Sequence, residues 1–261
     1  MKKLLLGSVA WAALVVGPAM AADLPMKAPA LAPAIPTWSW AGFYIGGHGG
    51  YGWKRNDFQE FLQTGSPVTI GGIDSKGWVY GGQVGYNWQY NWFVGGLEVD
   101  VSGTNIKGDS APATVLFGLG TVVQTNIRSD EVKLLGTARG RVGYAFNTGC
   151  CWNALLYGTG GLAWERVNRI DSSVQVGPGS VLVTTTTSPR NQFGWVAGIG
   201  GELQVANTNW IARVEWLHYD FGQVESSTVQ IGTASGASFA DNGGKQTINV
   251  VRGALSYKFA P

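Results

Sequence analysis

Apolar and polar residues alternate along residues 195–221, on both sides of a short turn at Ala206-Asn207-Thr208. Successive side chains of a strand point to opposite faces, so a period of two sorts residues by face. In the second run one face carries Trp210, Ala212, Val214 and Trp216, and the other carries Ile211, Arg213 and Glu215. The pattern predicts a β-hairpin with one apolar face and one face that carries charges.

The same alternation recurs and predicts eight strands in all. They lie at about 40–53, 77–89, 92–103, 132–146, 154–165, in the two halves of 195–221, and at 246–259. Very short connections, such as a tight turn at Tyr90-Asn91 and a turn at 147–153, alternate with long ones at 54–76, 104–127, 166–191 and 222–245. All ten prolines are expected outside the strands, as ladder hydrogen bonding requires. Long loops at one end and short turns at the other are typical of outer-membrane barrels.

Charged residues share one face of these strands, and the large aromatic and aliphatic residues share the other. The charged set is Glu98, Asp100, Arg139, Arg141, Glu165, Glu202, Arg213, Glu215 and Arg252. Lys133 is expected on the same face as Arg139. Such a mixed set cannot form the dry interior of a soluble barrel, but its members can pair inside a barrel whose outside faces lipid.

A soluble sandwich with the charges on its solvent face is the alternative. It does not explain why Trp and Tyr gather on the opposite face near strand ends, where membrane interfaces select them. We therefore expect an all-β fold: an eight-stranded antiparallel transmembrane β-barrel with four long extracellular loops and short periplasmic turns.

Composition agrees with this fold. The 261 residues include 40 Gly, 12 Trp, 9 Tyr and 10 Phe, and only 13% are charged, which suits closely packed strands with aromatic girdles. Beyond the first residues no run of 18 apolar residues occurs, so insertion into a membrane would have to use a closed barrel.

The amino-terminal residues are expected to direct export. Residues 1–22 combine Lys2 and Lys3, an apolar stretch at Leu4–Val16 that is too short for a spanning helix, and the small residues Ala19 and Ala21 of a cleavage site. We predict a cleaved signal peptide at 1–22, a Pro/Ala-rich periplasmic linker at 23–39 and the barrel at 40–261. Cleavage would leave 16 Lys+Arg against 16 Asp+Glu, and this near-neutral chain gives no reason to expect nucleic-acid binding.

Two cysteines and two histidines are the remaining candidates for chemistry. Cys150 and Cys151 are adjacent in a predicted turn, with no His or other Cys nearby for a metal site. A tolerated turn pair is the simpler interpretation, and redox work or intermolecular bridging is the alternative. His48 is expected to face the lumen, and His218 to be an interfacial aromatic near the outer end of its strand.

Several segments together carry a resemblance to a known family. They are AADLP at 21–25, WAGFYIGGHGGYGW at 40–53, GGQVGYNWQ at 81–89, LLGTARGRVGYAF at 134–146, LYGTGGLAW at 156–164, GWVAGIGGEL at 194–203, NWIARVEWLHYDFG at 209–222 and LSYKF at 255–259. With them the chain resembles the alphaproteobacterial outer-membrane immunogenic proteins, which are small porin-like surface-antigen β-barrels. Ala260-Pro261 after the terminal aromatic, and the cysteine pair, depart from that pattern.

The resemblance implies an integral protein of the bacterial cell outer membrane with both termini in the periplasm. It also implies that Tyr257 and Phe259 form the carboxy-terminal signal read by the barrel-assembly machinery. Outer-membrane lipid and lipopolysaccharide are the other expected partners, with a host or surface ligand at the loops. No cofactor and no enzymatic activity are expected.

The leading functional hypothesis is a structural and surface-display role. The interior of eight strands is about wide enough for its own side chains, so Arg–carboxylate pairs would hold the lumen closed and function would lie in the loops. Val174–Val176 and Val181–Val183, around Gly177–Gly179, suggest strands that continue past the membrane and expose β edges. Flexible polar loops are an equal alternative.

Three other functions remain open from the sequence. A narrow porin-like channel for ions or small solutes would use the same polar lumen. An outer-leaflet lipid-modifying enzyme would need a nucleophile and a carboxylate near one of the two histidines. Haem capture by a loop is implied only by resemblance to some relatives.

Overall fold

The computed structural model describes residues 39–56, 59–62, 67–68, 73–110, 112–117, 122–147, 152–205, 208–223, 228–230, 238–242 and 245–259. Within these ranges no helix is long and apolar enough to cross a membrane. The predicted signal peptide at 1–22 and the predicted linker, apart from Ser39, lie outside the described residues and stay predictions.

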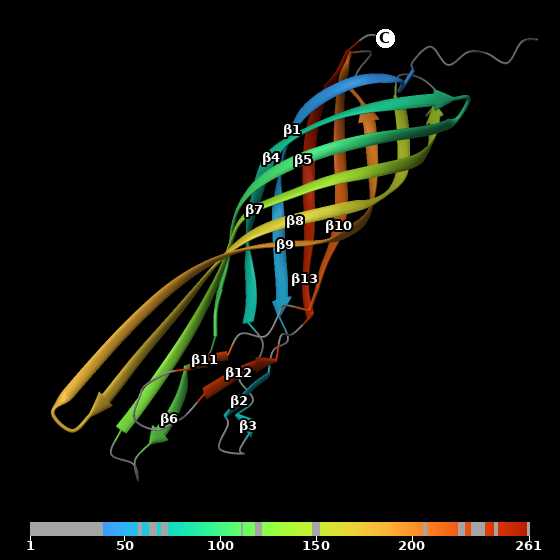
Figure 1. Ribbon diagram of the computed structural model, residues 1–261. Coiled ribbons are helices and arrows are strands. Elements are labelled where there is room, and N and C mark those ends of the chain that lie inside the picture. The colour runs from blue at the N-terminus through green and yellow to red at the C-terminus, as the bar shows by residue number, and fades with distance from the viewer. Residues whose placement is uncertain are drawn as a thin grey trace, which may run out of the picture. The chain divides into compact units, whose positions relative to one another are not determined.

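Eight long strands form the barrel (Figure 1). They are β1 (Gly42–Asn56), β4 (Ile73–Tyr90), β5 (Phe93–Asp109), β7 (Val122–Asn147), β8 (Asn153–Gly177), β9 (Ser180–Gln204), β10 (Trp210–Gln223) and β13 (Lys245–Lys258). Each pairs antiparallel with its neighbours, and the β5–β7 and β1–β13 pairings close the ring. The predicted eight-stranded antiparallel barrel is confirmed.

Five short strands lie within the predicted long connections. β2 (Gln59–Leu62), β3 (Pro67–Val68), β11 (Thr228–Gln230) and β12 (Ser238–Asn242) form a separate antiparallel sheet in the order β11-β12-β2-β3. β6 (Ala113–Phe117) pairs with the first residues of β7, Val122–Asn126.

The pairing register fixes the width of the barrel. A path along paired residues starts at Trp210 on β10, crosses β13, β1, β4, β5, β7, β8 and β9, and returns to β10 at Asp220, ten residues further on. With eight strands this stagger gives a strand tilt of about 40° and an interior that side chains can fill.

The turns at one end are short. β4 and β5 are joined by Asn91-Trp92, because Tyr90 pairs with Phe93, so this turn lies one residue later than predicted. Asn91 has a positive φ of 53°, which asparagine tolerates better than most residues. Cys150 and Cys151 lie outside the described residues.

At the other end the strands run well past the predicted limits. β8 and β9 remain paired through the predicted connection at 166–191, up to a two-residue turn at Pro178-Gly179 (Figure 1). Of the two alternatives that the sequence leaves open here, the structure shows continued strands rather than a flexible loop, with Val174 paired to Val183. The prediction that every proline lies outside the strands is wrong, because Pro189 lies in β9, on an edge where proline is tolerated. Pro67 also lies in a short strand, β3.

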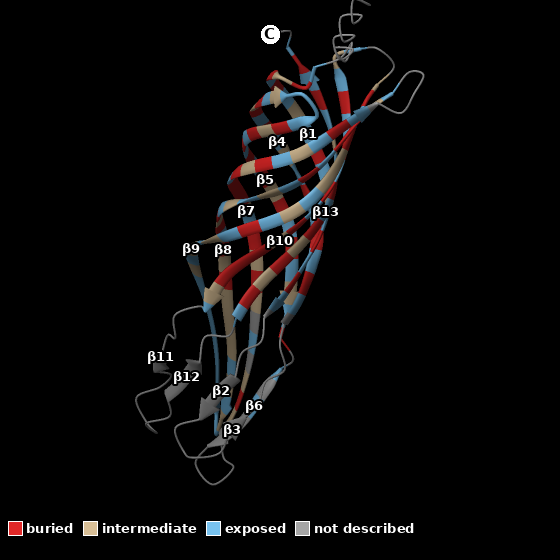
Figure 2. Cartoon of the chain, turned by 90° about the vertical axis from the view of Figure 1, so that its right-hand side faces the viewer, coloured by how far each residue is buried: buried red, intermediate tan, exposed pale blue. Residues whose placement is uncertain are grey.

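Buried and exposed residues alternate along the barrel strands (Figure 2). Apolar residues such as Phe43, Leu97 and Ile199 are exposed on the outer face, whereas the charged residues are buried inside. The predicted inversion of faces is therefore present. Lys133 is an exception to the predicted phase: a register shift between Val132 and Leu134 turns it outward, and its side chain is 46% exposed.

Candidate functional site

The lumen contains a cluster of four arginines and four carboxylates, which we call the charge cluster. Its members are Glu98, Asp100, Arg139, Arg141, Glu202, Arg213, Glu215 and Arg252. Each is at most 4% exposed, and they come from β5, β7, β9, β10 and β13. The structure thus brings together eight of the nine charged residues that the sequence pattern selects.

Ion pairs link the cluster across the lumen. Arg213 Nη1 and Nη2 lie 2.6 Å from Glu98 Oε2 and 2.7 Å from Glu202 Oε1. Arg139 pairs with Glu98 and also lies 3.0 Å from Asp100 and 3.1 Å from Glu215. Because the four positive and four negative charges balance, each buried charge has a nearby opposite charge, as burial requires.

Two rows of paired residues give the cluster an internal repeat. One row is Tyr44, Gly85, Glu98 and Arg139 on β1, β4, β5 and β7, and the other is Tyr157, Gly200, Glu215 and Arg252 on β8, β9, β10 and β13. In each row the tyrosine hydroxyl donates to the glutamate two strands away, at 2.6 Å in the first and 2.9 Å in the second.

Glycine makes this crossing possible. A Cβ built at Gly85 would lie 2.3 Å from the Tyr44 hydroxyl, and one at Gly200 would lie 2.4 Å from the Tyr157 hydroxyl. Each tyrosine therefore reaches its glutamate over the glycine of the strand between them. Alternation along the strands places Tyr44 and Tyr157 on the inward face, but it does not select them as site residues. The repeated pattern Arg-Gly-x-x-x-Tyr-x-Phe at 139–146 and 252–259 marks β7 and β13 as equivalent strands of the two halves, and this repeat is the signal that could have led to the pair.

The tyrosine rings also contact the arginines. Arg141 Cζ lies 4.2 Å from the centroid of the Tyr157 ring and 5.6 Å from that of Tyr44. Arg213 Cζ lies 5.5 Å from the Tyr44 centroid and 5.8 Å from the Tyr157 centroid. Stacking of this kind favours arginine over lysine, so the pair of rings fixes the guanidinium groups in place.

Two groups of buried apolar residues lie on either side of the charge cluster along the strands, among buried polar residues such as Glu165 and Gln204. The group towards the short turns consists of Trp40, Val94, Ala145, Leu155, Tyr157 and Ile211. The other group consists of Val79, Ile106, Val132, Leu135, Ala163, Val167, Val196, Leu217, Tyr219, Phe221, Ile248 and Val250. On β5, for example, Val94 comes first, the carboxylates follow, and Ile106 lies beyond them.

Glu165 is the charged residue that the structure does not bring into the cluster. It is buried on β8 and accepts a hydrogen bond from Gln246 on β13, further along the barrel than the arginines. The sequence pattern identified its face correctly but not its distance from the other charges, because face follows from parity and distance follows from the register.

His48 lies in the lumen, as expected, beside a serine. Its Nε2 is 2.7 Å from Ser102 Oγ, its Nδ1 is 2.5 Å from Gln83 Oε1, and Arg252 Nη1 is 3.4 Å from Nε2. A serine next to a histidine is the start of a nucleophile–base pair. Both side chains are buried within the lumen, so the geometry gives this pair a structural hydrogen-bonding role.

Outside the lumen, Glu131 on β7 forms ion pairs with two lysines, Lys107 on β5 and Lys133 on β7. Lys107 and Lys133 each place Nζ 2.7 Å from Glu131 Oε1. Hydrogen bonds from these two ammonium groups hold the pKa of Glu131 below its ordinary value. Lys133 takes up this environment in place of the lumen, with both lysines largely exposed and Glu131 partly buried.

Comparisons with known proteins agree with this architecture. A family model described as "Outer membrane protein beta-barrel domain" matches residues 9–259. The chain belongs to this outer-membrane β-barrel family. It is 34% identical to the 31 kDa outer-membrane immunogenic protein of Brucella melitensis biotype 1, over 99% of this chain and 100% of that protein. It is 31% identical to the 22 kDa outer membrane protein of Rhizobium leguminosarum bv. viciae, over 73% of this chain and 68% of that protein.

Among solved structures, the chain is similar to the outer membrane protein OprG from Pseudomonas aeruginosa. The TM-score is 0.42 and the identity is 12%, over 85% of this chain and 97% of OprG. Because that score is low, the family assignment stands on the sequence matches alone. The resemblance to outer-membrane immunogenic proteins is confirmed, and the protein is located in the outer membrane.

The outer face of this family member therefore faces lipid, and its aromatic residues form two groups. Towards the short turns, ring pairs include Phe43–Tyr86 and Trp210–Tyr257, with centroids 4.7 and 5.3 Å apart. Towards the other end, Trp195 and His218 have centroids 5.7 Å apart. His218 also lies 2.9 Å from Asn249 Oδ1. These positions match the aromatic girdles at the two membrane interfaces.

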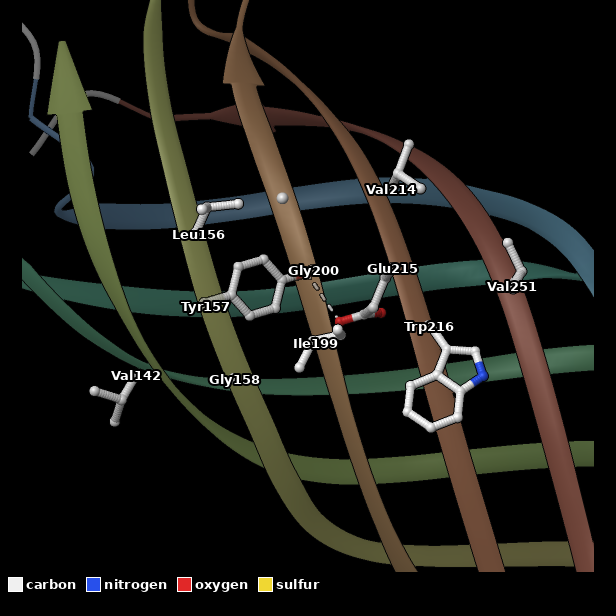
Figure 3. Close-up of a pocket in the computed structure, with 11 residues that line it drawn as sticks. Val142, Leu156, Tyr157, Gly158, Ile199, Gly200, Val214, Glu215, Trp216 and Val251 are labelled. Atoms are coloured by element: carbon white, nitrogen blue, oxygen red, sulfur yellow. Dashed lines mark hydrogen bonds between the residues drawn. The ribbon is translucent and has the colours of Figure 1, made fainter.

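A hollow of about 660 Å³ lies against β8, β9 and β10 (Figure 3). Outward-facing apolar side chains dominate its lining, among them Leu156, Ile199, Val214 and Trp216. The Tyr157–Glu215 hydrogen bond is visible behind it (Figure 3). The wall of the hollow is therefore mostly apolar and belongs to the lipid-facing surface.

Tyr257 and Phe259, the expected assembly signal, lie at the end of the last barrel strand. Their rings pack edge to face with centroids 5.4 Å apart, and both are exposed on the outer face. The backbone N–H of Phe259 donates to the carbonyl oxygen of Phe43 at 2.8 Å. The two aromatics therefore lie on the lipid-facing side of the seam where β13 meets β1.

Proposed function

We propose that this protein is a closed outer-membrane barrel that supports the membrane structurally and displays its long connections at the cell surface. The observation that carries this proposal is the charge cluster itself, whose eight members are each at most 4% exposed and lie next to opposite charges, with buried apolar residues on both sides along the strands. Ion flow needs a continuous polar path. Paired arginines and carboxylates with almost no exposed surface fill the lumen at the level of the cluster, so the narrow channel is the weaker candidate.

The ion pairs have a clear role in this proposal. Arg213 and Arg139 each contact carboxylates on more than one strand, so they tie opposite walls of the barrel together. Buried ion pairs add little net stability, but loss of one partner is costly. The cluster would therefore hold the lumen in one closed arrangement.

The sidedness follows from the two kinds of connection. We place the long connections outside the cell and the short turns, with both chain ends, in the periplasm. β1 and β13 meet near these ends, since Tyr44 pairs with Lys258, and outer-membrane barrels have short periplasmic turns. In this orientation Tyr257 and Phe259 would be presented to the assembly machinery, and the outer aromatic group would contact lipopolysaccharide.

Surface labelling tests the display role. Single cysteines would be introduced at Thr187 on the projecting β8–β9 hairpin and at Asn91 in a short turn, after Cys150 and Cys151 are replaced by serine. A membrane-impermeant maleimide should label Thr187→Cys on intact cells and should label Asn91→Cys only after the outer membrane is opened. Labelling of Asn91→Cys alone on intact cells would contradict the proposed orientation.

A further inference from the structure

One long strand edge is left open beyond the barrel. β9 pairs with β10 only from Trp195 onwards, whereas its residues Ser180–Gly194 pair with β8 alone. Along Ser180–Ser188 the sequence is SVLVTTTTS, which has no charge and is rich in β-branched residues. Among the described residues, this edge therefore has no neighbouring strand on its outer side.

The free hydrogen-bonding groups of this edge can be assigned. Gly177 and Ser180 flank the two-residue turn, and such flanking residues form a hydrogen-bonded pair. By the alternation of an antiparallel ladder, the even-numbered residues of this segment turn their N–H and C=O groups towards β8. Val181, Val183, Thr185 and Thr187 turn theirs towards the open edge. Pro189 has the same parity, so its missing N–H costs the β8 ladder nothing.

Only the part of the edge near the barrel is protected. Proteins usually block exposed edges with proline, charge or a bulge, and here Pro189-Arg190 does so next to the barrel. The distal part carries no such feature: its pairing to β8 has no register shift. Val181, Leu182 and Val183 are 67%, 60% and 64% exposed. This part of the edge has the properties of a template for another strand.

We propose that the β9 edge from Val181 to Thr187 is a strand-addition site that takes an extended, uncharged polypeptide segment of a partner protein. Backbone N–H and C=O groups would provide the affinity, and the β-branched side chains on both faces would select uncharged, β-branched neighbours. The inference rests on the proposed function, because that function places the edge outside the cell. It names the site and the chemistry of the contact.

A foreign segment suits this edge better than the β9 of a second copy. A second copy in the same membrane stands in the same orientation, so its β9 would run parallel to this one. Parallel pairs are slightly less stable per residue than antiparallel pairs. An unattached segment can add in the antiparallel direction.

Peptide binding to purified, folded protein in neutral detergent tests the site. The probe is a fluorescent, capped peptide of alternating threonine and valine, about seven residues long, with an uncharged solubilising tail. Its matched control carries the same side chains but has alternate backbone nitrogens methylated, so it cannot complete a ladder. We expect saturable binding of the first peptide and at least about tenfold weaker binding of the second.

Two protein variants locate the contact. Thr185→Pro removes an N–H from the open edge while leaving the β8 ladder intact, as Pro189 does, and should weaken binding at least about tenfold. Thr185→Val keeps the backbone donor and should bind like the wild type. Absence of binding to the wild type, equal binding of the methylated peptide, or unchanged binding by Thr185→Pro would each overturn the proposal.

Analytical sedimentation of the same protein samples without peptide tests whether a second copy of the chain occupies the edge instead. A wild-type dimer that Thr185→Pro converts to a monomer would show that a second copy, rather than a partner segment, occupies the edge, and would overturn the proposal as stated. Because these assays use detergent-solubilised protein, they do not depend on orientation or lumen closure. A failure here is therefore distinguishable from a failure of the proposed function.

Discussion

The hydroxyl of Tyr157 on β8 donates a 2.9 Å hydrogen bond to Glu215 on β10, across the intervening strand β9. The contact exists because Gly200 on β9 has no side chain. Tyr44, Gly85 and Glu98 repeat the arrangement on the other half of the barrel. Two tyrosine–glutamate contacts over glycine thus connect strands that are not hydrogen-bonded neighbours.

Gly200→Ala should destabilise the barrel. The new methyl group would lie 2.4 Å from the Tyr157 hydroxyl and 2.5 Å from Cζ, so the ring must move and the buried glutamate loses a donor. We expect the free energy of unfolding to fall by about 2 kcal/mol, measured by denaturant titration of tryptophan fluorescence in detergent micelles.

Gly201→Ala is the matched control for that variant. Its Cβ would approach Leu156 Cδ2 at 3.4 Å on the outer face, which is ordinary contact. Its unfolding free energy should stay within about 0.5 kcal/mol of the wild type. Equal losses in the two variants would refute the role assigned to Gly200.

Removal of one arginine from the charge cluster should be costly. Arg252 Nη2 lies 2.7 Å from Glu215 Oε2 and 3.3 Å from Asp100 Oδ2, so Arg252→Met leaves two buried carboxylates short of a partner. We expect a loss of about 3 kcal/mol in the same unfolding assay. Arg166→Met, which removes an exposed cation from β8, should leave the midpoint almost unchanged, and a similar loss in both variants would contradict the account.

A charge introduced on the outer face should lower the free energy of unfolding if that face lies in the hydrocarbon of the membrane. Ile199 is 65% exposed on the outer face of β9, opposite Trp216 of β10, and Ile199→Arg should cost about 2 kcal/mol when unfolding is measured in bilayers. Thr187→Arg lies on the projecting part of the same strand and should have no measurable effect. If Ile199→Arg were equally neutral, this face would not lie in hydrocarbon.

The face of most barrel residues can be predicted from the sequence, whereas their neighbours across the lumen cannot. Parity along a strand decides the face, so Glu98, Arg139 and Glu215 were correctly expected inside. Lys133 is also expected inside, but it lies on the outer face. The register shift between Val132 and Leu134 reverses the alternation at that point, and the sequence gives no sign of this shift. A single β-bulge is enough to turn a charged side chain from the inner to the outer face of the barrel.

Contacts across the lumen depend on the stagger of the whole barrel. The row that brings Tyr44, Gly85 and Glu98 together exists only for one register, and no local pattern determines that register. The projecting hairpin was ambiguous for another reason. Its segment Thr184–Thr187 is polar, which is typical of a loop, but threonine is also β-branched, which favours a strand.

The terminal aromatic should affect assembly more than stability. Phe259→Ser leaves its backbone bond to Phe43 intact, but it removes a ring from the expected assembly signal. The amount of folded protein in the outer membrane should fall several-fold, while unassisted refolding in detergent remains close to wild type. Phe146→Ser changes the equivalent position of the internal repeat and should reduce the membrane amount much less; equal reductions would argue against a terminal signal.

Conductance of the folded barrel in a planar bilayer tests the closed lumen most directly. Heat-modifiable gel migration would first show that the purified protein is folded. Because the charges of the cluster are paired and almost fully buried in the lumen, we predict no discrete conductance steps from the wild type. Reproducible steps that change in Arg139→Ala or Glu202→Ala would contradict the closed barrel and make the charge cluster the lining of a channel.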